Sequence, residues 1–281
     1  PPWHPQRLAT AGYAPWREML STVLRHAGGV RVDHILGLFR LYWIPRMASP
    51  LTGTYVSYDF EAMVGILALE AQRASAVVIG EDLGTVEPWV QDVLAQKAVL
   101  GTSIVWFEHD DDDYSPLPQE KYRQLALSSV NTHDLPPTLA YLRGDHISLR
   151  AHLGVLTRSV EEEQRDDIEW QARVLAAVAD RGLLPQRDYL VDPAERASRG
   201  AEEDISEALH RYIVGTPSAL ACTSLVDMVG DVRAQNQPGT THDLYPNWCV
   251  PLCDTNGAPL LIEDLPSLEF FQRLAATSRK D

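Results

Sequence analysis

Short β-rich segments alternate with helical segments along this chain of 281 residues, and no other feature limits the possible folds as strongly. We expect five strands, near residues 30, 78, 104, 129 and 221. The predicted helices cover residues 15–26, 59–74, 87–97, 119–125, 267–276 and most of the charged stretch 146–215. Strands that alternate with helices form a parallel sheet with crossover connections, so the expected class is α/β. No Gly-rich phosphate-binding loop follows any strand, which argues against a nucleotide-binding fold.

Most of the predicted strands end in polar side chains, where a buried strand would continue with apolar residues. These polar residues are Arg31, Asp33 and His34 after the first strand, Glu81 and Asp82 after the second, His133 and Asp134 after the fourth, and Asp227 after the fifth. The third strand ends instead in two aromatic residues, Trp106 and Phe107. The carboxyl ends of parallel barrel strands meet on one face, which is where catalytic residues sit in such folds.

Three carboxylates on one face favour glycosyl chemistry. A retaining mechanism needs a carboxylate nucleophile and a carboxylic acid about 5–5.5 Å apart, and a third acid can hold sugar hydroxyls. Arg31 lies two residues before Asp33, so both side chains point to the same side of a strand. A guanidinium beside a carboxylate favours the charged form of that carboxylate.

Each candidate also has a structural interpretation that the residues alone leave open. Asp134 precedes Leu-Pro-Pro and could cap a helix, Glu81 and Asp82 could belong to a solvated loop, and Asp33 could form a salt bridge with Arg31. The two histidines, His34 and His133, could be hydrogen-bonded structural residues, and Trp106 could belong to the core.

Four longer segments resemble one enzyme family. The segments GGVRVDHILGLFRLYWIP, VVIGEDLGTVEPWV, SSVNTHDLPPTLAYL and VRAQNQPGTTHDLYPNW are similar to motifs of the 4-α-glucanotransferases (amylomaltases, or disproportionating enzymes) of the α-amylase clan, and they occur in the same order. The resemblance covers residues 1 to about 252. It implies transfer of α-1,4-glucan segments between maltodextrin or starch-type acceptors through a covalent glycosyl-enzyme. An ordinary α-amylase would have Ala where His34 stands.

The resemblance also implies a role for individual residues. The implied nucleophile is Asp33, the acid and base is Glu81, and the transition-state stabiliser is Asp134. The implied sugar contacts are Arg31, His133, His34, Trp106 and Asn236. No cofactor and no metal are expected. The acidic segment 109–114 lacks the glycine and the spaced final Glu of a calcium loop, so we interpret it as a solvated loop.

The implied fold is a (β/α)8 TIM barrel, of which this chain would supply about the last five strands. We expect barrel strands four to seven in residues 1–145, a helical subdomain in 146–215, and the last strand with a C-terminal segment in 216–281. The chain begins without Met, so we expect a C-terminal part of a longer protein. Without the missing N-terminal part the barrel cannot close, and the isolated chain is expected to have weak activity or none.

Composition limits the possible binding partners and the cellular compartment. The formal net charge of −15 disfavours nucleic acid and anionic membranes, which bind Lys/Arg patches, but is compatible with a neutral sugar. Three cysteines form no disulfide framework, so we expect reduced thiols in a cytoplasmic protein. Two alternatives to glucan transfer stay open, namely an α-glucan hydrolase of the same clan and an inactive sugar-binding fragment.

Overall fold

The computed structural model describes residues 2–110 and 112–279, which form two compact units. The first unit comprises Pro1–Thr102 and Arg123–Leu127, and the second comprises Ser103–Tyr122 and Ser128–Asp281. Strands β5 (Gly101–Ile104) and β6 (Ala126–Ser129) contribute residues to both units. In the described residues, no helix is both long and apolar enough to cross a membrane.

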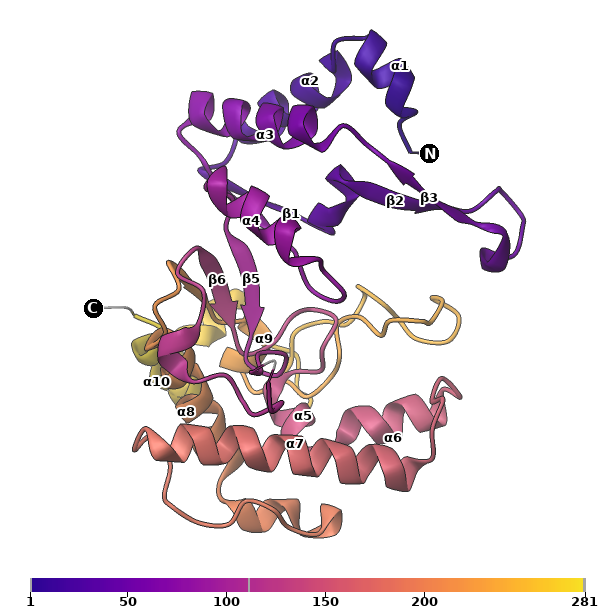
Figure 1. Cartoon of the computed structure of the whole chain (residues 1–281). Coiled ribbons are helices and arrows are strands. Elements are labelled where there is room, and N and C mark those ends of the chain that lie inside the picture. The colour runs from indigo at the N-terminus through magenta and orange to yellow at the C-terminus, as the bar shows by residue number, and fades with distance from the viewer. Residues whose placement is uncertain (1, 111, 280–281) are drawn as a thin grey trace. The chain divides into compact units, whose positions relative to one another are not determined.

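The first unit is built around a parallel strand pair and two packed helices. Its regular elements are α1 (Pro5–Thr10), α2 (Ala14–Leu24), β1 (Gly29–Val32), β2 (Arg40–Trp43), β3 (Thr54–Ser57), α3 (Phe60–Ala74), β4 (Val77–Gly80) and α4 (Pro88–Gln96). Strand β1 pairs in parallel with β4, with Val32 opposite Gly80. Helices α2 and α3 pack against each other, as Figure 1 shows.

The core of the first unit lies around this helix pair and the ends of the paired strands. Leu67 of α3 is fully buried, and the Trp16 indole of α2 donates a hydrogen bond of 3.0 Å to the Met63 carbonyl. Ile35 follows β1 and packs over the end of β4. A Cβ atom at Gly80 would approach the Ile35 side chain to 2.9 Å, so only glycine allows this contact. Glycine at position 80 therefore lets the segment after β1 lie directly on β4.

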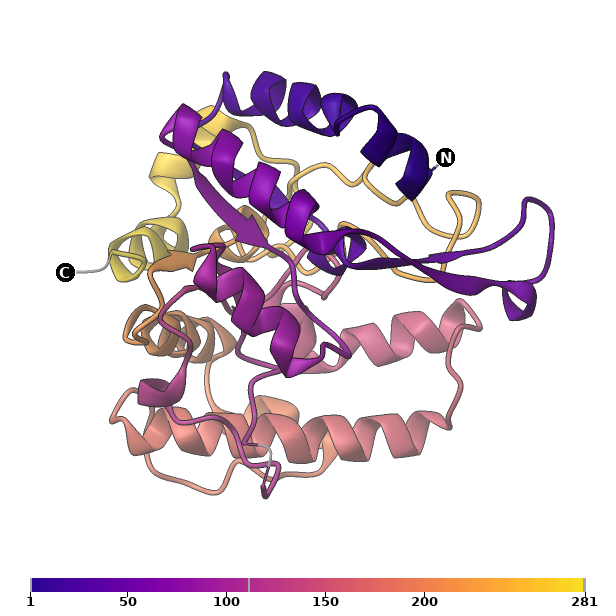
Figure 2. The same cartoon turned by 45° about the horizontal axis from the view of Figure 1, so that its top comes forward.

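Strands β2 and β3 form an antiparallel hairpin that the alternation of strands and helices did not predict. The hairpin extends away from the helices of the first unit (Figure 2). Its strands have only four residues each, and a Pro-containing segment (44–53) connects them, so no long period-2 pattern appears in the sequence. Cross-strand contact between the rings of Tyr42 and Tyr55, with centroids 5.1 Å apart, contributes to the pairing.

The second unit combines strands with a large helical part. Its helices are α5 (Thr138–Arg143), α6 (Asp145–His152), α7 (Val160–Asp180), α8 (Glu202–Val214), α9 (Leu225–Met228) and α10 (Glu269–Thr277). Strand β7 (Leu220–Cys222) pairs with β6 in the order β5-β6-β7. The long helix α7 begins with a capping box between Ser159 and Glu162, and α6 packs along it (Figures 1 and 2).

All five predicted strands are present, as β1, β4, β5, β6 and β7. The predicted helix 119–125 is wrong, since only a single 3₁₀ turn, Gln119–Lys121, forms there. Two contacts explain this difference: the Arg123 side chain pairs with Asp82, and the Leu125 carbonyl accepts a hydrogen bond from Gly101 at the start of β5. The chain therefore becomes extended where a helix was expected.

The predicted helical stretch 146–215 holds for α6, α7 and α8 but not for the connection between α7 and α8. Residues Gly182, Pro185, Pro193 and Gly200 interrupt helix formation there, and the connection contains only the 3₁₀ segment Pro193–Arg199. This stretch shares one compact unit with residues 128–145 and with the C-terminal segment. The predicted division into 1–145, 146–215 and 216–281 stays a prediction for the complete protein.

The α3 helix offers a direct test of local capping. The predicted cap is present, because Asp59 Oδ1 accepts a hydrogen bond of 3.1 Å from the Ala62 amide. We expect Asp59→Ala to lower the free energy of unfolding by about 1 kcal/mol in chemical denaturation. Asp59→Asn keeps an acceptor oxygen and should cost only a few tenths of that value. Tyr13→Phe isolates the other contact of Asp59, the 3.1 Å bond from the Tyr13 hydroxyl. Equal losses in all three variants would show that capping is not the cause.

Candidate active site

In the first unit, the parallel register of β1 and β4 brings two candidate carboxylates to neighbouring strand ends. Val32 and Gly80 are opposite each other, and the Glu81 amide donates a hydrogen bond of 2.9 Å to the Val32 carbonyl. Asp33 and Glu81 each follow directly. Backbone positions paired on adjacent strands are about 4.8 Å apart, so the two side chains start from neighbouring points of the same strand edge.

Backbone amides hold the Glu81 carboxylate on both of its oxygens. Oε2 accepts a hydrogen bond of 2.8 Å from the His34 amide, and Oε1 accepts one of 2.8 Å from the Leu83 amide. The Glu81 carbonyl accepts a further bond of 2.9 Å from Ile35. Each carboxylate oxygen keeps a second lone pair that can carry a proton. Glu81 therefore has a defined orientation and can still exchange a proton.

The Asp33 carboxylate is open to solvent on one side and bound to a cation on the other. Its side chain is 76% exposed, and Oδ1 lies 2.8 Å from Nη1 of Arg31. The predicted ion pair is thus present. Exposed ion pairs contribute little to stability, so this pair is weak support for the fold, and the Asp33 carboxylate is accessible from solvent. The arrangement suits a nucleophile whose rotamer is set by Arg31.

The backbone turns sharply at His34, directly after Asp33. His34 has a φ of 46°, in the left-handed region that residues with a Cβ atom rarely adopt. This turn ends β1 and directs the His34 amide toward Glu81. Strained backbone of this kind concentrates at functional sites and needs support from its surroundings. Here the support comes from the Glu81 carboxylate and carbonyl.

The residue after Glu81 has a structural role. The Asp82 side chain is buried and accepts hydrogen bonds from Nη1 of Arg123 at 2.5 Å and from the Thr102 amide at 2.8 Å. Arg123 also donates to the Thr102 carbonyl at 2.6 Å. A buried carboxylate with this many partners fixes the chain directly behind Glu81. Of the two neighbouring acids, only Glu81 is free to reach a substrate.

In the second unit, three of the predicted residues meet. Asp134 Oδ1 accepts a hydrogen bond of 2.6 Å from Nδ2 of Asn236, and Asp134 Oδ2 lies 3.4 Å from Nε2 of His133. The side chains of His133 and Asp134 are 40% and 51% exposed. The possible role of Asp134 as a helix cap is wrong, since α5 begins only at Thr138, after Pro137. Its carboxylate is therefore available to a ligand.

One aromatic residue of this cluster was missed by the sequence prediction. The Trp248 ring lies 5.2 Å from the His133 ring, between centroids, and 63% of the residue is exposed. The loop that carries Trp248 and Asn236 is closed by hydrogen bonds, including Trp248 amide to Gln235 carbonyl at 2.9 Å. The available signal was the Trp in the sequence LYPNW, a large aromatic residue directly after Pro and Asn, which are typical of loops.

Trp106 occupies a different environment from the one expected for a sugar platform. It is only 4% exposed, and its ring packs 4.5 Å from the Tyr141 ring, between centroids. Its carbonyl accepts a hydrogen bond of 2.9 Å from the Trp170 indole. No ring face of Trp106 is open for stacking in this structure. Trp106 therefore has the core position that the sequence analysis gave as the alternative.

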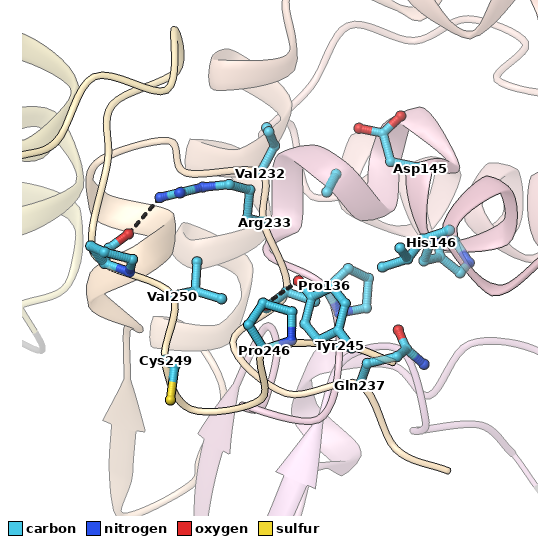
Figure 3. A pocket seen from close by; sticks show the side chains of 14 residues that line it. Pro136, Asp145, His146, Val232, Arg233, Gln237, Tyr245, Pro246, Cys249 and Val250 are labelled. Atoms are coloured by element: carbon cyan, nitrogen blue, oxygen red, sulfur yellow. Dashed lines mark hydrogen bonds between the residues drawn. The ribbon is translucent and has the colours of Figure 1, made fainter. Parts of the chain in front are cut away.

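Two pockets of the second unit border this cluster. The first, of about 460 Å³, has largely apolar walls (Figure 3). The Tyr245 hydroxyl donates to the Ala234 carbonyl at 2.6 Å and Arg233 donates to the Pro251 carbonyl at 2.5 Å, whereas the buried Nδ1 of His146 has no hydrogen-bond partner among the described residues. Asp145 and His146 project from α6 on the side opposite Cys249. Burial lowers the pKa of His146 to about 4, helped by nearby arginines, so its imidazole is neutral near pH 7.

The second pocket, of about 430 Å³, is the one that Asp134 lines. It is more polar, with Arg150, Glu163 and Trp170 in its walls, and therefore offers the mixture of charged groups and an aromatic ring that suits a carbohydrate. Within residues 2–110 and 112–279, no group of three or more metal-ligating side chains is present. In the acidic segment 109–114, the Lys121 ammonium 3.0 Å away lowers the pKa of Asp110.

A family model described as 4-alpha-glucanotransferase matches residues 1–255. A 4-alpha-glucanotransferase of Mycobacterium tuberculosis is 53% identical over 283 aligned positions, which cover 99% of this chain and 37% of that protein. One of Haemophilus influenzae is 30% identical over 90% of this chain and 35% of its own length. The chain thus spans little more than a third of these relatives.

Two solved structures are similar over the whole chain. The amylomaltase of Corynebacterium glutamicum is 58% identical with a TM-score of 0.96, and the alignment covers 40% of that protein. An amylomaltase of Streptococcus agalactiae in complex with acarbose is 17% identical with a TM-score of 0.64, over 48% of its chain. The second likeness concerns the fold alone.

The Asp82–Arg123 pair gives a prediction about the support of Glu81. We expect Arg123→Met to lower the free energy of unfolding by about 3 kcal/mol, because it leaves the buried Asp82 carboxylate without its cation. Adding Asp82→Asn to that variant should recover part of the loss, since no unpaired charge then stays buried. The matched control is Arg158→Met, which breaks an exposed pair with Asp166 and should change stability little. Chemical denaturation measures all three, and an equal effect in the control would contradict the argument.

Proposed function

The chain belongs to the 4-alpha-glucanotransferase family, and on this basis we propose that the complete protein transfers α-1,4-glucan segments between maltodextrins or related glucans. The observation that carries the proposal is the juxtaposition of Asp33 and Glu81 at neighbouring ends of the parallel strands β1 and β4. Two carboxyl groups carried at neighbouring strand ends can reach the separation of about 5–5.5 Å that a retaining double displacement needs. Maltodextrin or glycogen metabolism is the corresponding physiological setting.

In the first step, Asp33 attacks the anomeric carbon of the donor while Glu81 protonates the glycosidic oxygen. The bond from the anomeric carbon to that oxygen breaks, a bond to an Asp33 oxygen forms, and the leaving chain departs with the proton of Glu81. The Arg31 guanidinium, 2.8 Å from Asp33 Oδ1, orients the nucleophile and leaves Oδ2 free. The amides of His34 and Leu83 keep Glu81 in place for the proton transfer.

In the second step, Glu81 acts as the base. It removes the proton from the 4-hydroxyl group of an acceptor glucan, whose oxygen attacks the anomeric carbon and releases Asp33. Net retention of the α-configuration follows from the two inversions. Glu81 ends the cycle protonated, as it began.

We assign the cluster of the second unit to sugar binding. Asp134 is proposed to hold hydroxyl groups of the distorted sugar, with Asn236 and His133 setting its orientation. Hydrogen bonds that strengthen as the sugar ring flattens lower the barrier directly. Trp248, with its exposed ring beside His133, is proposed as an aromatic platform. His34 and Trp106 are weaker candidates, because His34 acts through its amide and Trp106 is buried.

Transfer rather than hydrolysis requires that a glucan hydroxyl outcompetes water for the glycosyl-enzyme. Aromatic surfaces such as Trp248 bind the acceptor chain and exclude water from its path. The similarity to 4-alpha-glucanotransferases supports transfer over the hydrolase alternative. A cytoplasmic location belongs to the same proposal and is supported by the three free cysteines.

We further propose that the complete protein closes a (β/α)8 barrel, with β1, β4, β5, β6 and β7 as its last five strands. The chain spans 37–40% of its more similar relatives, which supports additional strands in the complete protein. Among the described residues, β1 pairs only with β4 and β7 pairs only with β6, so each keeps an edge that a further strand can pair with.

Incubation of the complete protein with maltotriose tests the proposed reaction. We expect glucose together with maltodextrins longer than maltotriose, because each transfer lengthens one chain while shortening another. Chromatography of the products over time measures both. Glucose and maltose without any longer product would instead identify a hydrolase.

Replacement of the nucleophile tests the assignment of Asp33. We expect Asp33→Asn in the complete protein to lower kcat by roughly 10³-fold or more, because no glycosyl-enzyme can form. The matched control is Asp92→Asn, which changes an exposed acid on α4 and should leave the rate of maltotriose disproportionation unchanged. A variant Asp33→Asn that retains transfer would show that another group is the nucleophile.

Comparison of the 281-residue chain with the complete protein tests the barrel proposal. We expect the isolated chain to be at least about 100-fold less active per molecule, since catalytic geometry tolerates displacements of less than about 1 Å. Disproportionation of maltotriose at equal concentrations measures the ratio. Equal activity would mean that no further strands are needed.

A further inference from the structure

A single buried carboxylate accepts hydrogen bonds from both ends of the loop that carries His133 and Asp134. Asp227 of α9 accepts hydrogen bonds from Nδ2 of Asn131 at 3.0 Å and from the Thr138 amide at 2.7 Å on Oδ1. Its other oxygen accepts the Thr138 hydroxyl at 2.8 Å. Asn131 precedes the loop and Thr138 follows it. One side chain, 89 residues from Thr138 in sequence, therefore clamps the segment 132–137 at both ends.

The clamp is buried, whereas the loop it holds is open. Asp227, Asn131 and Thr138 are 1%, 5% and 0% exposed, and the side chains of His133 and Asp134 are 40% and 51% exposed. A charged group without water needs this many partners, since desolvation of an unpaired carboxylate is costly. The exposed residues His133 and Asp134 are therefore held by hydrogen bonds with which water does not compete.

The clamp also replaces a missing helix cap. Helix α5 begins after Pro137, which has no side chain that can accept a hydrogen bond, and no side-chain cap is present at that position. The Asp227 carboxylate accepts the first amide of the helix and places a negative charge at its positive end. Asp227 fixes the start of α5 and, through Asn131, the end of β6.

We propose that Asp227 is a positioning residue for Asp134. It acts through the backbone of the loop, which it holds in the geometry in which Asp134 meets Asn236 at 2.6 Å. This inference rests on the proposed glucan transfer and adds a residue that never touches the sugar. Replacement of Asp227 is therefore expected to lower turnover by more than the accompanying loss of folding stability accounts for.

The test compares four variants of the complete protein with the wild type. Asp227→Ala removes the clamp, and Asp227→Asn keeps one acceptor oxygen for the Thr138 amide. Thr138→Val removes one hydroxyl donor at nearly constant volume. The control, Glu70→Ala, removes another buried carboxylate, which pairs with Arg73 on α3 and does not contact this loop.

We expect Asp227→Ala to lower kcat for maltotriose disproportionation by about 100-fold with a smaller change in KM, because loop displacements near 1 Å cost this much. Asp227→Asn should restore kcat to within about tenfold of the wild type, and Thr138→Val should lower it several-fold. Glu70→Ala should lower the melting temperature with kcat unchanged. Hydrogen exchange of the Thr138 amide should accelerate strongly in Asp227→Ala and not in Glu70→Ala.

Two results would overturn the proposal. One is a folded Asp227→Ala protein with kcat within threefold of the wild type, and the other is unchanged exchange of the Thr138 amide in that variant. Should Asp227→Ala not fold, Thr138→Val decides through the same two measurements, since its packing is preserved. A wild-type protein without transfer activity contradicts the proposed function, whereas exchange at Thr138 still decides whether Asp227 holds the loop.

Discussion

The pairing of β1 with β4 in a parallel register is the interaction on which the candidate chemistry depends. It brings the residues after Val32 and after Gly80 to the same edge, although 48 positions separate them in the sequence. A register shift by one residue would turn Asp33 or Glu81 to the opposite face of the strand pair. Gly80 helps to exclude such a shift, because Ile35 rests on the position where a side chain would be.

Acidic residues serve two distinct purposes in this protein, and burial separates them. Asp33 and Asp134 are exposed, whereas Asp82 and Asp227 are buried and accept hydrogen bonds on both oxygens. The sequence alone does not separate the two groups, since the candidate acid Glu81 and the structural acid Asp82 are adjacent. The buried acids fix the backbone behind or beside the exposed ones, so the exposed side chains have few conformations to lose on binding.

Local pattern was sufficient to predict the five strands β1, β4, β5, β6 and β7, but not the hairpin strands β2 and β3. Asp227, expected at the end of the fifth strand, lies instead in helix α9, because β7 ends at Cys222. Short runs such as Val77–Gly80 are apolar, and they end abruptly at charged residues, so both the strand and its end are visible in the sequence. The roles within the cluster came from the resemblance of longer motifs. That Asp134 is not a helix cap required the structure, because the Pro-Pro sequence after it fits either a cap or a loop.

Apart from the β2–β3 hairpin, the features that escaped prediction depend on contacts between distant segments. The region 119–125 has helix-forming residues, but the pairing of Arg123 with Asp82 draws the chain into an extended path. Trp248 meets His133 only because a closed loop places it there, and Asp227 meets Thr138 across 89 positions. Propensity and periodicity describe near neighbours only, so neither of them contains this information.

In the proposed reaction cycle, the hydrogen bond from the His34 amide to Glu81 changes in strength as Glu81 loses and regains its proton. A carboxylate is a stronger acceptor than a carboxylic acid, so the bond tightens when Glu81 gives up its proton and relaxes when it regains one. The same amide belongs to the residue that follows Asp33. The proton on Glu81 and the backbone beside the proposed nucleophile are therefore thermodynamically linked: whatever one half of the proposed double displacement does to this backbone, the other half reverses.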